Sequence, residues 1–193
     1  MKQLLLVTSL VSIFAAANAM ADVTATATAS WDATATKDTS SVLVVTPLSS
    51  LTFQYAEGLN AFNTQEGAFD VTIQGQESAT DFELSARVIS KTLINSSGDP
   101  STLDVGVAWN GSPLTETDTT LTSSSLSNGL DNLTADGAYN GAGRVSDQSS
   151  FNFNISSATS DGSTPVSDYS ELPDGYWAGD VKVQFTATWT TPV

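Results

Sequence analysis

Two pairs of carboxylates come closest to the residue types and spacing that catalysis uses. Asp81 and Glu83, and likewise Glu116 and Asp118, stand two residues apart, so each pair shares one face if its segment is extended. A glycosidase needs two carboxyl groups at a set separation. Neither pair lies in the apolar sequence context that a catalytic acid requires, and solvated strand faces carry the same pattern. We therefore expect no catalytic residues and no enzyme.

Histidine and cysteine are absent from all 193 residues. Their absence excludes Ser-His-Asp and Cys-His catalysis, imidazole zinc sites and disulfides. The sequence also contains no Gly-x-Ser-x-Gly, no phosphate-binding glycine loop with lysine and no calcium-loop pattern. Residues 131–136 could contribute oxygen ligands to calcium, but they lack the spacing of a calcium-binding loop. A solvated loop is therefore the simpler interpretation. We predict no metal and no cofactor.

Four aromatic residues are the basis for an alternative class of function, a secreted carbohydrate-binding β-sandwich module. Trp109, Tyr139, Tyr176 and Trp177 could stack on sugar rings. In β-sandwiches such residues more often pack in the core or against loops, and packing is the interpretation that we favour. The carbohydrate-binding module remains the alternative.

The most regular element of the chain is residues 22–36, which run DVTATATASWDATAT. Every odd position from Val23 to Ala35 is apolar and every even one is polar, which is typical of a strand with one buried face. At a rise of about 3.3 Å per residue the segment would extend about 50 Å, longer than an ordinary strand. Its inward positions are Val23, Ala25, Ala27, Ala29, Trp31, Ala33 and Ala35.

Two interpretations of this segment stay open on periodicity alone. It could be the first strand of the chain's own sheet, because edge strands alternate in the same way. It could also be a donor strand that completes a neighbouring molecule by β-augmentation. We favour the donor strand, because a threonine and alanine ladder stays extended and soluble while unpaired, whereas a permanent first strand is usually richer in Val, Ile and Leu.

Residues 1–21 read as a secretion signal, with Lys2 in the positive region and an apolar run from 4 to 14 that is too short to span a bilayer. Cleavage is expected after Ala19 or Ala21. Removing Lys2 leaves 5 basic residues against 21 acidic ones, a net charge of −16. Nucleic acid and anionic membranes would repel a chain of this charge. We therefore expect neither nucleic-acid binding nor membrane insertion.

Residues 37–193 should form one β-sandwich domain. Short apolar segments separated by turn residues predict strands at 42–46, 51–55, 69–74, 82–90, 103–109, 151–155 and 180–189. Seven strands at these spacings are typical of an immunoglobulin-type sandwich. The least regular stretch, 115–150, is expected to hold a long loop, an edge hairpin or a short helix within 126–133. Because 181–189 alternates cleanly close to the end of the chain, we expect its outer edge to be open to an external strand.

Three blocks resemble the major-pilin family of the E. coli common pilus, within the alternate chaperone-usher class of fimbriae. They are DVTA at 22–25, the run KDTSSVLVVTPLSSLTFQYAEG from 37 to 58 with Phe62 and Asn63, and DYSELPDGYWAGDVKVQFTATW at 168–189. The resemblance is weakest between 93 and 150.

The resemblance implies an incomplete immunoglobulin-like β-sandwich that is completed by the N-terminal donor strand of the next subunit. It also implies polymerisation with identical pilin subunits, a periplasmic chaperone, an outer-membrane usher and a tip adhesin, with a fibre at the cell surface that supports adhesion to host cells and early biofilm formation. The acceptor groove should have residues 42–45 on one wall and 181–189 on the other. The residues expected to form it are Val42, Val44, Val181, Val183, Phe185, Ala187 and Trp189.

Overall fold

The computed structural model describes residues 37–38 and 40–192, which include a compact β unit that begins at Asp38. The expected signal and donor strand lie outside the described residues. The elements, in chain order, are β1 (Leu43–Pro47), β2 (Tyr55–Ala56), η1 (Glu57–Leu59), β3 (Ala61–Phe62), β4 (Gln65–Gln74), β5 (Asp81–Ser90), β6 (Thr92–Asn95), β7 (Thr102–Trp109), β8 (Ser112–Pro113), β9 (Thr119–Ser123), α1 (Asp131–Thr134), β10 (Arg144–Thr159), β11 (Pro165–Val166), η2 (Tyr169–Glu171), β12 (Trp177–Ala178) and β13 (Lys182–Thr190).

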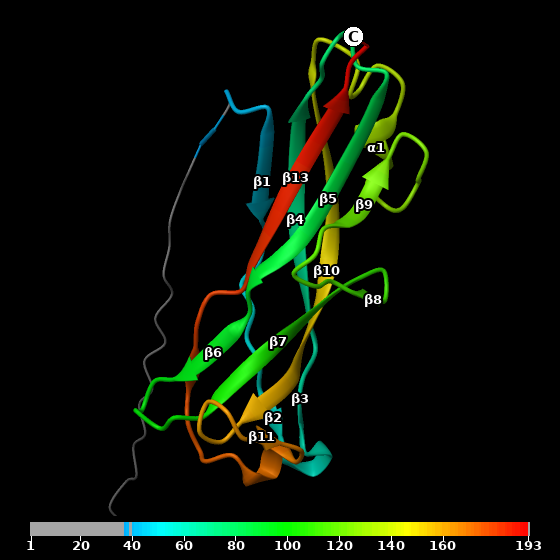
Figure 1. The fold of residues 1–193 in the computed structure, drawn as a ribbon. Helices are drawn as coiled ribbons and strands as arrows, with labels where there is room; N and C mark the ends of the chain where they lie inside the picture. The colour runs from blue at the N-terminus through cyan, green and yellow to red at the C-terminus, as the bar shows by residue number, and fades with distance from the viewer. Residues whose placement is uncertain (1–36, 39, 193) are drawn as a thin grey trace, which may run out of the picture. The chain divides into compact units, whose positions relative to one another are not determined.

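The larger of two packed sheets has the strand order β1-β4-β10-β7-β6-β12, with β11 beside β10 and β8 beside β7 (Figure 1). All of its pairings are antiparallel. Its central strands alternate between buried and half-exposed side chains, as Phe69, Val71 and Ile73 of β4 illustrate. This period of two places one face of each strand in the core.

The smaller sheet has the order β13-β5-β9 and is also antiparallel. The two sheets meet through aromatic rings: Phe185 of β13 lies 5.3 Å from Phe69 of β4 and 5.9 Å from Phe151 of β10, between ring centroids. Phe69 and Phe151 stack at 4.7 Å. The expected all-β sandwich of immunoglobulin type is therefore confirmed.

A close contact in the large sheet requires glycine at position 67. Gly67 of β4 lies opposite Phe151 of β10, and a Cβ at Gly67 would approach the ring of Phe153 to 2.5 Å. Because Phe153 is only 7% exposed, its ring has little room to move away.

Five of the predicted strands correspond to β1, β4, β5, β7 and β13, and 151–155 is the middle of a much longer β10. The predicted strand at 51–55 is wrong except at its end, because only Tyr55 and Ala56 pair, with the short β3. Within 115–150 the structure has β9, the short α1 and the first half of β10. The sequence did not reveal that half of β10, because residues 146–150 are polar on both faces.

Candidate acceptor groove

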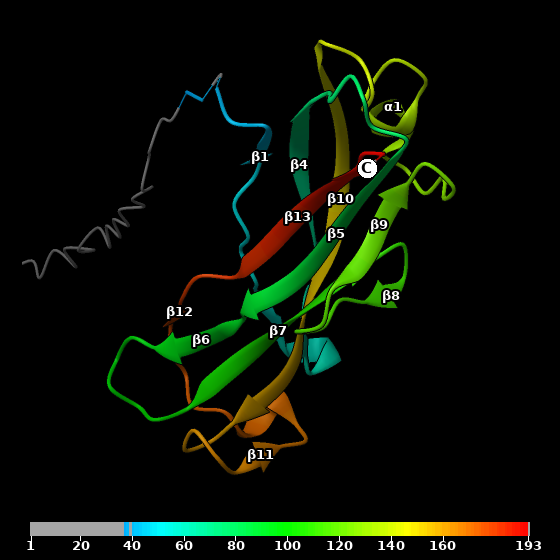
Figure 2. The same ribbon diagram turned by 45° about the horizontal axis from the view of Figure 1, so that its top comes forward.

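Both sheets end, on the same side of the β unit, at a strand that pairs on one edge only. Among the described residues β1 pairs only with β4, and β13 pairs only with β5. Figures 1 and 2 show β1 and β13 on this side of the β unit, and Figure 1 shows that they run in opposite directions. An antiparallel strand can form hydrogen bonds on both edges, so each of these two strands has one free edge.

The inner face of β13 carries four of the five residues that the sequence predicted for this wall, and the fifth, Val181, directly precedes the strand. Val181, Val183, Phe185, Ala187 and Trp189 pack against the core but are only partly buried, whereas the intervening residues of β13 are exposed. The corresponding inner residues of the neighbouring strand β5, such as Leu84 and Ala86, are fully buried. The inner face of β13 is thus left half-covered.

On the wall formed by β1, the inward residues are shifted by one position from both of the predicted ones. Leu43 and Val45 pack against the core, whereas Val42 is 51% exposed. Val44 lies opposite Thr72, whose hydroxyl is hydrogen-bonded to Ser146 on the outer face of the sheet. The expected wall residues Val42 and Val44 therefore face outward. The run 42–45 is VLVV and has no alternation, so periodicity could not decide which residues face the core.

The hydrogen bonds of β1 show which of its backbone groups are free. The N–H of Gln74 donates to the carbonyl of Val42, and the N–H of Leu48 donates to the carbonyl of Ala68, each at 2.8 Å. In an antiparallel ladder, alternate residues direct both backbone groups to the same neighbour. The even-numbered residues of β1 therefore bond β4, and the odd-numbered Leu43 and Val45 direct their N–H and C=O groups toward the open edge.

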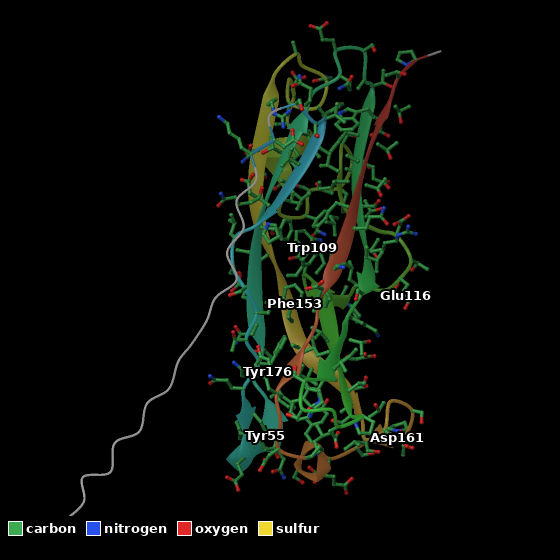
Figure 3. All side chains as sticks on the ribbon, turned by 90° about the vertical axis from the view of Figure 1, so that its left-hand side faces the viewer. Tyr55, Trp109, Glu116, Phe153, Asp161 and Tyr176 are labelled. Atoms are coloured by element: carbon green, nitrogen blue, oxygen red, sulfur yellow. The ribbon has the colours of Figure 1, made fainter. Side chains whose placement is uncertain are left out.

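We call the half-covered strip between 43–55 and 176–189 the acceptor groove. Its upper end, where β1 begins and β13 ends, is the end near α1, and its lower end is the one near β2, β3 and β11 (Figure 1). Figure 3 looks onto this side of the β unit and shows Trp109 and Phe153 in the interior between the strands. The core beneath the strip is aromatic: the Trp109 ring lies 6.2 Å from Phe69 and 5.6 Å from Phe151, and all three residues are buried.

At the lower end a second aromatic group continues the strip. Phe62 contacts Tyr169 at 5.6 Å and Trp177 at 6.4 Å between ring centroids, and all three are partly buried. Tyr55 contacts Phe62 at 5.4 Å, and Figure 3 shows it with Tyr176 toward the lower end. Sequence reasoning missed this group, because its members come from separate, short elements.

The aromatic residues considered for sugar binding do not form a common surface. Trp109 is 3% exposed in the core, and Tyr139 stacks on Phe82 at 6.0 Å. The indole N–H of Trp177 donates to the hydroxyl of Ser101 at 3.1 Å. Only Tyr176 is largely exposed, at 71%. Packing therefore explains three of the four.

The carboxylates considered for catalysis lie on the surface. Asp81 and Glu83 are exposed on β5, and Asp81 accepts hydrogen bonds from the Phe82 N–H and the Ser124 hydroxyl. Glu116 and Asp118 lie in the exposed segment before β9. No group of His, Cys, Asp or Glu in the described part of the chain has a metal-binding arrangement.

Two surface aspartates have strongly perturbed acidity. Hydrogen bonds from the backbone N–H of Thr164 and of Ser163, and from both hydroxyls, hold the pKa of Asp161 well below its usual range. The hydroxyl and backbone N–H of Ser41 do the same for the pKa of Asp38. Both carboxylates close tight turns. Their acidity therefore bears on the stability of the loops.

The described residues contain no helix long and apolar enough to cross a membrane. The cations that form ion pairs lie on the surface, and each has an acidic neighbour: Arg87 with Asp118 at 3.8 Å, Lys91 with Asp104 at 3.6 Å and Lys182 with Asp180 at 3.4 Å. Exposed pairs of this kind contribute little to stability.

Comparison with known proteins identifies the family. The sequence model of fimbrillin MatB matches residues 24–189. The common pilus major fimbrillin subunit EcpA of Klebsiella pneumoniae is 49% identical over 196 residues, which cover 99% of this chain and all of the relative. EcpA of Escherichia coli O127:H6 is 48% identical with the same coverage. A solved structure, the CooA pilin subunit of enterotoxigenic Escherichia coli, has 16% identity and a TM-score of 0.48, and the match covers 79% of this chain and 90% of that one. The chain belongs to the MatB fimbrillin family, together with the major subunits of the common pilus.

Proposed function

We propose that this chain is a structural pilus subunit, not an enzyme, and that it polymerises by donating residues 22–36 to the acceptor groove of an identical subunit. One observation carries the proposal: the two sheets each end at a half-paired strand on the same side, and the inner faces of both strands are only half-covered. A strand inserted there would bond both free edges and cover the apolar strip.

The arm matches the groove in length and in surface chemistry. Residues 43–55 and 176–189 would extend about 43–46 Å along the two walls, and the 15-residue arm about 50 Å, at 3.3 Å per residue. The apolar face of the arm would meet the half-buried side chains of the walls, and its threonine face would remain in water. Burial of its five alanines at about 0.8 kcal/mol each, of Val23 at about 2 and of Trp31 at about 3 gives an upper estimate of about 9 kcal/mol.

The direction of the arm follows from where the β unit begins. The start of the β unit lies at the upper end, so an arm leaves its own subunit there (Figure 1). If one operation relates successive subunits along the fibre, the upper end of the donor meets the lower end of the acceptor. The arm then enters the acceptor from below, with Ala35 near the lower end and Val23 near the upper end. It runs antiparallel to β13.

Before assembly, the exposed strip would favour aggregation and needs a temporary cover. A periplasmic chaperone in the groove, followed by an outer-membrane usher that exchanges it for the next arm, meets this need. A tip adhesin would end the fibre. We place the assembled protein at the cell surface as a fimbrium. Adhesion to host cells and early biofilm formation are the roles that we expect for it from its family.

Deletion of residues 22–36 behind an intact secretion signal tests the proposal. Fibres sheared from cells that express the full chain should run as a ladder of multimers in unboiled detergent samples. The deleted protein should give no ladder and should stay bound to a chaperone or aggregate. A deleted protein that is a stable monomer and binds glycans would overturn the proposal in favour of the carbohydrate-binding module.

A further inference from the structure

We propose that Arg144 and Asp38 position successive subunits of the fibre, because they bind the chain before β1 to the β unit and leave Lys37 as the joint to the arm. The inference deepens the proposed function and rests on it. Its consequence is mechanical, since a junction with one free residue bends less than a junction with five.

The residues between the arm and β1 have the composition of a flexible linker. Residues 37–41 are KDTSS, without an apolar residue. Five free residues would have an end-to-end distance of about 12 Å, and one free residue about 5–6 Å. The structure shows instead that the compact β unit begins at Asp38, although β1 begins only at Leu43. Part of this polar segment therefore belongs to the β unit.

Two successive backbone carbonyls before β1 are bound by a single cross-strand pair of the large sheet. The Nη1 of Arg144, the first residue of β10, donates to the carbonyl of Ser41 at 2.7 Å. Arg144 lies opposite Gln74 of β4, and the N–H of Gln74 donates to the carbonyl of Val42 at 2.8 Å. The chain is thus held at both residues by neighbouring central strands.

The position of Gln74 is itself fixed. Its side-chain Nε2 donates to the carbonyl of Ala142 at 2.8 Å and to that of Gly143 at 3.2 Å, in the loop that leads into β10. The N–H of Gly75 donates to the same Gly143 carbonyl at 2.9 Å. Arg144 therefore starts from a backbone that is tied to β4 on both sides of the contact.

Asp38 extends the bound segment toward the arm. Its carboxylate accepts the backbone N–H of Ser40 at 2.9 Å and that of Ser41 at 3.0 Å, together with the hydroxyls of both serines. These bonds are exposed, but they converge on Ser41, whose carbonyl Arg144 holds. Hydrogen bonds from the hydroxyl and N–H of Ser41 also keep the pKa of Asp38 well below its usual range, so the acceptor stays ionised at neutral pH.

The use of Arg144 differs from that of the paired cations. With Lys2 removed the chain has 5 basic residues against 21 acidic ones. Arg87, Lys91 and Lys182 each form an ion pair with an aspartate, whereas among the described residues Arg144 forms none and bonds a backbone carbonyl. A charged donor makes a stronger hydrogen bond than a neutral one. Arg144 is thus placed to hold the chain.

Releasing this contact should make the fibre more flexible. The mean-square extension of a free linker grows in proportion to its number of residues, so five free residues in place of one increase it about fivefold. The persistence length of a fibre falls as the mean-square bend at each junction rises. We therefore expect the persistence length to fall at least about twofold and by up to about fivefold.

Electron micrographs of fibres sheared from cells give the persistence length by contour tracing. Arg144→Met keeps the apolar stem and removes the donor, and Asp38→Ala removes the acceptor at an exposed position. Both variants should keep the detergent-resistant ladder and form more flexible fibres, and Arg144→Lys should restore part of the stiffness. The matched control is Arg87→Met, which removes the same charge from a surface arginine of β5 that bonds Gln184. Its fibres should keep the full persistence length.

Unchanged persistence lengths in Arg144→Met and Asp38→Ala fibres would overturn the inference while leaving arm donation in place. Loss of the ladder in both variants, with unchanged thermal unfolding of the subunit, would also overturn it, because both residues would then be needed for assembly itself. If only Arg144→Met destabilises the subunit, the exposed Asp38→Ala decides the matter alone. Absence of a ladder from the unaltered chain would instead refute the proposed function.

Discussion

Ala187→Asp should abolish polymerisation and leave the isolated subunit folded. Ala187 lies on the inner face of β13 opposite Leu84, and its side chain is partly buried. In a free subunit an added carboxylate can reach water through the open side of the groove. In a fibre the arm would cover it, with no cation among the inward residues of the arm to pair with it.

Leaving a charge buried and unpaired costs about 3–5 kcal/mol, to be set against the upper estimate of about 9 kcal/mol for burial of the arm. Subunit association should therefore weaken roughly 10²- to 10⁴-fold. The assay is the amount of detergent-resistant ladder from sheared cells, with circular dichroism of the purified subunit to establish that it is folded.

Thr186→Asp is the matched control, since Thr186 is the adjacent residue on the exposed face of β13. It adds the same charge to the same strand and should assemble nearly normally. If both variants form equal ladders, or if both lose them equally while remaining folded, the inner face of β13 is not the covered face and the groove is wrongly assigned.

Four further outcomes are expected. Ala27→Asp in the arm should block assembly while its neighbour Thr28→Asp does not, because successive residues of a strand face opposite sides; equal ladders would contradict an inserted apolar face. Gly67→Ala should lower the free energy of unfolding by about 1–3 kcal/mol, because its Cβ would overlap a packed ring, and Gly58→Ala, with no atom near its Cβ, should change it little in thermal unfolding. Fibre stability should be unaffected by reductant and flat between about pH 5 and 8, because cysteine and histidine are absent; a loss of stability across neutral pH would refute this expectation. The pKa of Asp161 is lower in the folded chain than in the unfolded chain. The contribution of Asp161 to the stability of the subunit is therefore complete above about pH 4 and is lost as the pH falls further, and thermal unfolding below pH 4 measures this loss.

Much of the groove could be predicted from local sequence, because alternation of period two is a local property. The segment 181–189 alternates without interruption, so the inner face of β13 followed directly from it. The same argument predicts the inward face of the arm. It did not work for β1, whose run of four apolar residues is compatible with either face, and only pairing with β4 places Leu43 and Val45 inside.

Length, composition and spacing therefore determined an acidic all-β chain without histidine or cysteine and with two strongly alternating segments. The tertiary structure decided that β1 and β13, about 140 residues apart in the chain, end two different sheets on the same side. It also brought together the aromatic residues of the lower end, from β3, η2 and β12. Both features depend on which strands pair and how the two sheets stack. Such long-range contacts depend on how all the strands pack together, and no local pattern of residues encodes them.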